Sequence, residues 1–73
     1  MDTKEQTFRS QLGLNIRVAR TRKRLTQEKL AELTNISEKH LTKIENGQVT
    51  TNIYYVYKIA QVLDVTVETL LED

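Results

Sequence analysis

The fold of this chain is decided by residues 25–47, which read LTQEKLAELTNISEKHLTKIENG. Thr26 stands directly before a run with helical spacing of apolar residues, and Ser37 stands directly before a second such run. Both residue types are favoured N-caps, because the side-chain oxygen accepts from a free backbone N–H of the first turn. The stretch therefore predicts one helix over about 27–34 and a second over about 38–45.

A connection of about three residues joins these two predicted helices, so they must cross steeply. Ala31 supplies the small side chain that a close crossing needs. Asn35 tolerates the left-handed backbone that the turn requires, and Gly47 is the expected C′ residue of the second helix. The outer face of the second helix is left polar, and a short, rigid polar helix suits insertion into a major groove.

Helical spacing continues on both sides of this stretch. Leu12, Ile16 and Ala19 recur at i, i+4 and i+7, while Asn52 and Thr66 are N-cap candidates further along. The remaining expected helices cover about 7–23, 53–63 and 67–71. We therefore expect an all-α fold, a compact bundle of five helices in which the second and third form a helix-turn-helix.

Composition limits the classes of function. The chain has 73 residues, no cysteine and one histidine, so it offers neither a disulfide framework nor a thiolate metal site. It has no phosphate-cradling glycine loop and no evident pair of catalytic carboxylates, so we expect no enzyme, no metal and no cofactor. No apolar run is long enough for a membrane span, and residues 1–11 lack a signal-peptide pattern, so we expect a cytoplasmic protein without membrane contact.

Charge is distributed unevenly along the chain. Residues 15–43 carry eight basic and three acidic side chains, a net charge of +5, whereas residues 44–73 carry one basic and five acidic side chains, a net charge of −4. Such asymmetry predicts one basic surface and one acidic end. A basic surface on a small domain is typical of nucleic-acid binding, although an ordinary solvated helix face would give the same pattern.

The segments Leu25–Ala31, Ile36-Ser37 and Ile44–Gly47 resemble the helix-turn-helix of the Cro/cI-type phage repressors and their bacterial relatives. The resemblance extends upstream to Leu12, Ile16 and Arg20, and downstream to 58–60 and 63–65. It departs from the family at Arg24 and Asn35, where glycine is common, and at Thr50-Thr51, where proline is frequent. We take residues 11–73 as the DNA-binding domain and residues 1–10 as a flexible or fraying extension of its first helix.

The resemblance implies a sequence-specific regulator of double-stranded DNA, a repressor that acts as a homodimer on a pseudo-palindromic operator. It implies phosphate contacts for Gln27 and Asn46, and a salt bridge between Arg20 and Glu45. Arg20 is also a phosphate candidate. The base-reading candidates are Glu38, Lys39 and Lys43, supported by Ser37 and Thr42.

Dimerisation is expected near the last helix, either in free solution or only on DNA. The candidate interface residues are Val65, Val67, Leu70 and Leu71, although the same residues could instead close the core of the monomer. Among the tyrosines we expect Tyr57 in the core, with Tyr54 and Tyr55 more exposed. An antitoxin-like module that binds a protein partner of unknown identity, and a purely structural helical domain, remain open alternatives.

Overall fold

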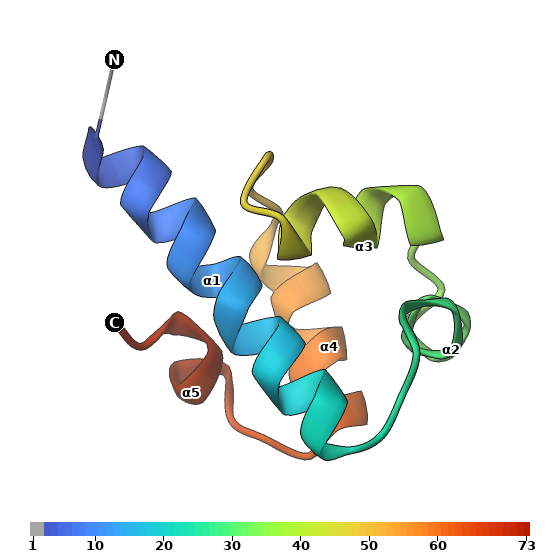
Figure 1. Cartoon of the computed structure of the whole chain (residues 1–73). Coiled ribbons are helices and arrows are strands. Elements are labelled where there is room, and N and C mark those ends of the chain that lie inside the picture. Colours follow the sequence, from blue (N-terminus) through green and yellow to red (C-terminus); the bar gives the residue numbers. More distant parts are fainter. Residues whose placement is uncertain (1–2) are drawn as a thin grey trace.

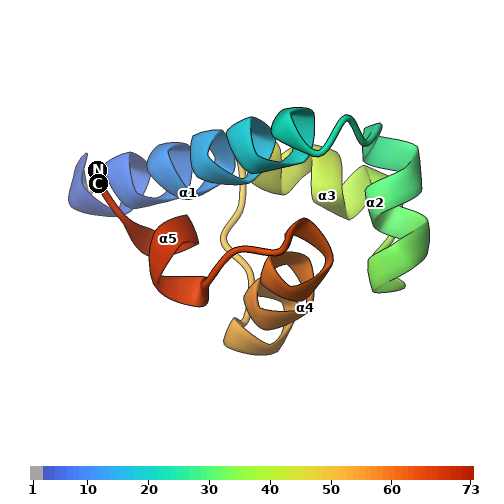
Figure 2. The ribbon, with the colours of Figure 1, turned by 90° about the horizontal axis from the view of Figure 1, so that it is seen from below.

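A computed structural model describes residues 3–73, and it is all-helical over that range. The five helices are α1 (Thr3–Arg22), α2 (Gln27–Thr34), α3 (Glu38–Glu45), α4 (Ile53–Leu63) and α5 (Val67–Leu71). The long helix α1 runs along one side of the bundle, with α2 and α3 toward one end and α5 toward the other (Figure 1). In the view of Figure 2, α1 runs along the upper part of the picture, α4 is drawn below it, and α5 lies to the left of α4.

The predicted boundaries of the last four helices are confirmed, and their N-caps explain why. Thr26, Ser37, Asn52 and Thr66 each have extended backbone and accept a hydrogen bond from the backbone N–H three residues further on, over 2.8–3.1 Å. Each cap satisfies one of the free donors of the first helical turn. Because each cap acts within three residues of the start of its helix, these boundaries can be predicted from the sequence alone.

The first helix is longer than predicted. It begins at Thr3 rather than near residue 7 and ends at Arg22. Residues 3–10 are therefore helical, and Arg9 donates to Glu5 at 2.8 Å on the exposed side of this segment. The expected flexibility of this segment stays a prediction, and its first two residues lie outside the described part of the chain.

Four turns use left-handed backbone. Asn35, Asp64 and Gly47 have φ values of 58°, 60° and 72°, and Arg24 has a φ of 60°. Asparagine and aspartate tolerate this region better than most residues, and glycine enters it freely. Arg24, which the resemblance places where glycine is common, keeps the backbone geometry that a glycine would provide, despite the steric cost of its side chain.

The core draws on all five helices. Its fully buried side chains are Leu12, Ile16, Leu30, Leu41, Ile44, Ile59, Leu63 and Leu70. Tyr57 is not among them, because 48% of its surface is exposed, so its predicted core position is wrong. The side chain of Tyr55 is instead the half-buried tyrosine that packs against this core.

Close approach of α1 to the end of α3 depends on Gly13. A Cβ at this position would lie 2.5 Å from the carbonyl oxygens of both Ile44 and Glu45. No real Cβ contact is that short, so only glycine lets the two backbones come together here. This contact fixes the C-terminal end of α3 against α1.

Candidate nucleic-acid interface

The outer face of α3 is an exposed polar surface. Glu38, Lys39 and Lys43 are all exposed on it, and with Thr42 and Gln48 they line a shallow hollow. The inner face of the helix is anchored by Leu41 and Ile44, which are fully buried. The three exposed base-reading candidates therefore share one solvent-facing surface. The buried inner face fixes the orientation in which α3 presents that surface.

Ser37 and Thr42, the two supporting candidates, have structural partners in this protein. The Ser37 hydroxyl caps α3 by accepting from the backbone N–H of His40 at 3.1 Å. The Thr42 hydroxyl is half-buried and donates to the side-chain oxygen of Gln27 at 2.9 Å. Both residues therefore shape the surface from which the exposed charges project.

The C-terminal end of α3 holds a buried carboxylate. The Glu45 side chain has no exposed surface, and Arg20 donates to its two oxygens from Nε at 2.7 Å and from Nη2 at 3.0 Å. Arg20 also donates from Nη1 to the carbonyl of Leu25 at 2.8 Å. This bidentate geometry matches the planar fork of a guanidinium, and it ties α1 to the end of α3 and to the start of the α2 segment. The salt bridge expected from the sequence is thus present.

Gln27 joins the same network from the first position of α2. Its amide nitrogen donates to Glu45 Oε1 at 2.9 Å, and its amide oxygen accepts from Thr42. An amide nitrogen carries two hydrogens, so one of them remains available for another acceptor. The residue predicted to contact phosphate therefore lies at a helix N-terminus with a fixed orientation and a spare donor.

Arg17 also joins this network, a role that the sequence did not predict. Its Nη2 donates to Asn46 Oδ1 at 2.8 Å, and its Nε lies 3.7 Å from Glu45 Oε1. This contact uses only the amide oxygen of Asn46, so its amide nitrogen is a separate donor. The available signal was the three-residue step from Arg17 to Arg20, which places both guanidinium groups on the same side of α1.

His40 occupies an aromatic cluster at the side of α3. Its ring meets the Tyr55 ring edge-on at 5.8 Å, and its Nε2 lies 3.5 Å from the Thr51 hydroxyl. The Lys58 ammonium lies 5.1 Å and 5.3 Å from the ring centroids of Tyr54 and Tyr55.

The residues that the structure describes include no group of three or more potential metal-binding side chains. Within the same range, no helix is both long enough and apolar enough to span a membrane.

The predicted dimer patch divides into different environments. Leu70 is fully buried and belongs to the core of the monomer, so it has no surface to offer a partner. Val65 and Val67 are half-buried against the core, and Leu71 is exposed. The N-terminal half of α4 adds exposed apolar side chains that the prediction did not include: Ile53, Tyr54 and Tyr57.

Comparison with known proteins is consistent with this geometry. A helix-turn-helix family model matches residues 16–70. The DNA complex of SinR, a master regulator for biofilm formation, is similar at 35% identity and a TM-score of 0.79, over 84% of this chain and 98% of that one. The restriction-modification controller protein C.AhdI from Aeromonas hydrophila is similar at 31% identity and a TM-score of 0.80, over 84% and 92% of the two chains.

The clp gene regulator ClgR from Corynebacterium glutamicum is also similar, at 26% identity and a TM-score of 0.84, over 88% of this chain and 68% of that one. No curated protein sequence matches this chain at a significant level.

Proposed function

This chain belongs to the Cro/cI-type helix-turn-helix family of DNA-binding regulators, and from that membership we propose that it is a sequence-specific repressor that binds double-stranded DNA as a homodimer. The observation that carries the proposal is the outer face of α3, where three exposed charged side chains project from a helix whose inner face is fully buried. A helix of this kind fits the major groove, where base edges carry a distinct pattern of donors and acceptors.

Lys39 and Lys43 are the proposed readers of guanine, because an ammonium group donates to O6 and N7. They lie one helical turn apart on the exposed face and make no ion pair within residues 3–73. Glu38, in the first turn, is suited to accept from the amino group of cytosine. Ser37, the N-cap of α3, and Thr42, within the helix, support these contacts.

Gln27 and Asn46 are the proposed phosphate contacts, and they bracket α3 from the start of α2 and from its own C-terminus. Each has an amide nitrogen with a hydrogen left free by the contacts described above. Contacts to phosphate fix the register of a protein on the duplex without reading its sequence. Arg20 is mainly occupied by Glu45 and Leu25, so its proposed phosphate contact would use only the N–H groups that remain.

A dimer follows from the limited information that one short helix reads. A single half-site offers too few base contacts to discriminate among genomic sequences, whereas two half-sites about 34–36 Å apart double the information read. We propose that Val67 and Leu71 of α5 contribute to the dimer contact, together with the exposed apolar side chains of α4. Two chains on one operator would exclude other proteins from the same grooves, which is the basis for a repressor role.

The proposal is tested by selecting bound sequences from a random duplex pool and measuring the number of chains on the selected site. We expect a pseudo-palindromic motif and two chains bound cooperatively. A Lys39→Ala, Lys43→Ala double variant should retain binding at low salt but select no clear motif. A single chain bound with full specificity to an isolated half-site would refute the dimer, and failure to select any motif would refute sequence-specific binding.

A further inference from the structure

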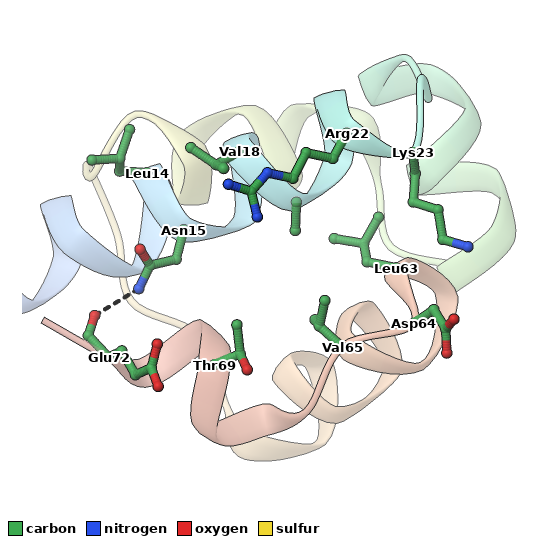
Figure 3. Close-up of a pocket in the computed structure, with 11 residues that line it drawn as sticks. Leu14, Asn15, Val18, Arg22, Lys23, Leu63, Asp64, Val65, Thr69 and Glu72 are labelled. Carbon is green, nitrogen blue, oxygen red and sulfur yellow. Dashed lines mark hydrogen bonds between the residues drawn. The ribbon is translucent and has the colours of Figure 1, made fainter.

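Outside the proposed DNA-binding surface, a cavity of about 380 Å³ lies between α1, the α4–α5 connection and α5. Cavities of several hundred Å³ are the size class that holds small organic ligands. Figure 3 shows its walls, with Leu14, Val18 and Arg22 on the α1 side and Val65, Thr69 and Glu72 on the opposite side. The proposed DNA-binding role uses none of the residues on the α1 side.

The cavity lies on the opposite side of α1 from α3. Gly13, Arg17 and Arg20, at steps of four and three, face α3, whereas Asn15 and Arg22 lie about half a turn of the helix away. Asn15 closes the cavity toward α5 by donating to the backbone carbonyl of Glu72 at 2.7 Å. A molecule bound there would therefore be separated from the DNA-binding face by the thickness of a helix.

The floor of the cavity is apolar and partly open to solvent. Leu14 is 49% exposed and Val18 is 38% exposed, although both are aliphatic residues of a helix that packs into the core. Val65 and Leu63 line the opposite side. An apolar group placed between these side chains would remove aliphatic surface from water, which is the main source of affinity in small-molecule sites.

Opposite charges stand on the two sides of this floor. The Arg22 guanidinium projects over the cavity from α1, and the Glu72 carboxylate lies across from it beside Thr69 (Figure 3). Within the described residues 3–73, neither side chain takes part in a salt bridge. Lys23 and Asp64 also line the cavity, but they lie at its far end beside Leu63 (Figure 3). The end bounded by Asn15 thus presents the Arg22 cation on one side, the apolar floor in the middle and the Glu72 anion on the other side.

We propose that this cavity binds a short apolar peptide with free ends, of about two residues. Its C-terminal carboxylate would meet Arg22, its aliphatic side chains would cover Leu14 and Val18, and its N-terminal ammonium would meet Glu72. A simple fatty acid satisfies only one of the two charges and places its tail against a carboxylate. A zwitterion with an apolar middle satisfies both charges, and this distinction makes the proposal testable.

The test is an NMR titration of the ¹⁵N-labelled full chain with leucyl-leucine, N-acetyl-leucyl-leucine and leucyl-leucinamide. The free dipeptide should shift the amide signals of Leu14, Val18 and Val65 and leave those of α3 in place. Blocking either end should weaken binding about threefold to fivefold, as expected for an ion pair near the surface.

Variants assign each end to its partner. Arg22→Gln should abolish the preference for a free carboxylate while keeping the preference for a free ammonium, and Glu72→Gln should do the reverse. Lys29→Gln and Glu68→Gln make the same charge changes at exposed positions outside the cavity and should bind the dipeptide like the wild type. These comparisons use ratios between ligands, so they stand even if a variant changes stability.

Three outcomes would overturn the proposal. The first is the absence of shifts up to the solubility limit of leucyl-leucine, and the second is equal binding of all three peptides by the wild type. The third is that the same signals shift when the protein alone is concentrated, which would assign this face to a second copy of the chain. None of these outcomes bears on DNA binding, which is measured separately.

Discussion

Replacing Glu45 with glutamine tests the network that holds the DNA-binding helix in place. The substitution keeps the shape of the side chain but removes its charge and one of its two acceptor oxygens. Arg20 would then face an amide instead of a carboxylate. Because only 13% of the Arg20 side chain is exposed, water cannot fully replace the lost partner. We expect the folded state of Glu45→Gln to be markedly less stable than that of the wild type.

The magnitude follows from the burial of the two charges. Breaking a buried ion pair by removing one partner costs about 3–5 kcal/mol. Arg20 keeps some exposure and its bond to the Leu25 carbonyl, so we expect a loss of about 2–4 kcal/mol. A domain of 73 residues has a total stability of about 4–11 kcal/mol, so this loss is a large fraction of the total. At about 4–8 °C per kcal/mol, the midpoint of thermal unfolding should fall by about 8–32 °C.

Urea denaturation followed by circular dichroism at neutral pH measures the effect. Glu32→Gln is the matched control, because Glu32 also pairs with a cation, Lys29 at 3.1 Å, but both of these side chains are largely exposed. Exposed pairs contribute little, so the control should lie within about 0.5 kcal/mol of the wild type. Combining Glu45→Gln with Arg20→Met should cost less than the sum of the two single changes, because both remove the same interaction.

The reasoning fails if Glu45→Gln and Glu32→Gln have the same stability. It also fails if the effects of the Arg20 and Glu45 changes are additive, since additivity would mean that the two side chains do not interact in solution. A changed slope of the unfolding free energy against urea concentration would instead indicate an altered denatured state. The test of the Arg20–Glu45 interaction would then rest on the double-variant cycle.

Three further predictions use the same chain. Gly13→Ala should lower stability by about 1–2 kcal/mol in urea denaturation, because overpacking against two carbonyls outweighs the gain in helix propensity; an unchanged midpoint would contradict the close approach. Gln27→Ala and Asn46→Ala should weaken binding to all duplexes by similar factors in fluorescence anisotropy, and a changed sequence preference would reassign them. Lys39→Ala or Lys43→Ala should cost about 1–3 kcal/mol on the best site and relax a few base positions, whereas equal losses on random DNA would demote both to phosphate contacts.

The parts of this fold that the sequence predicted are those specified by local chemistry. The boundaries of α2 to α5 depend on caps such as Ser37 and on left-handed residues such as Asn35, and each acts within one turn of the chain. The Arg20–Glu45 salt bridge spans 25 positions, and it was predicted through resemblance to a family. Residue pattern alone would have left these two residues as separate charges.

The features that the sequence did not predict depend on distances between helices. Gly13 has no turn or cap around it, and its role appears only when the end of α3 lies against α1. Leu70 and Leu71 are chemically identical neighbours, yet one is buried and the other exposed, because a single step of 100° around α5 separates core from surface. Tyr57 has the helical spacing of a core residue, but the core of so short a chain is too small to cover its side chain.

One side chain links the two parts of the proposed DNA contact. Gln27 donates to Glu45 and accepts from Thr42, and both of those residues belong to α3. The residue proposed to contact phosphate is therefore oriented by the helix proposed to read bases. A shift of α3 would misplace Gln27 at the same time, so an incorrect position in the groove would lose phosphate contacts as well as base contacts. Such coupling makes the affinity for DNA depend on the rigidity of this interior network as well as on the exposed side chains.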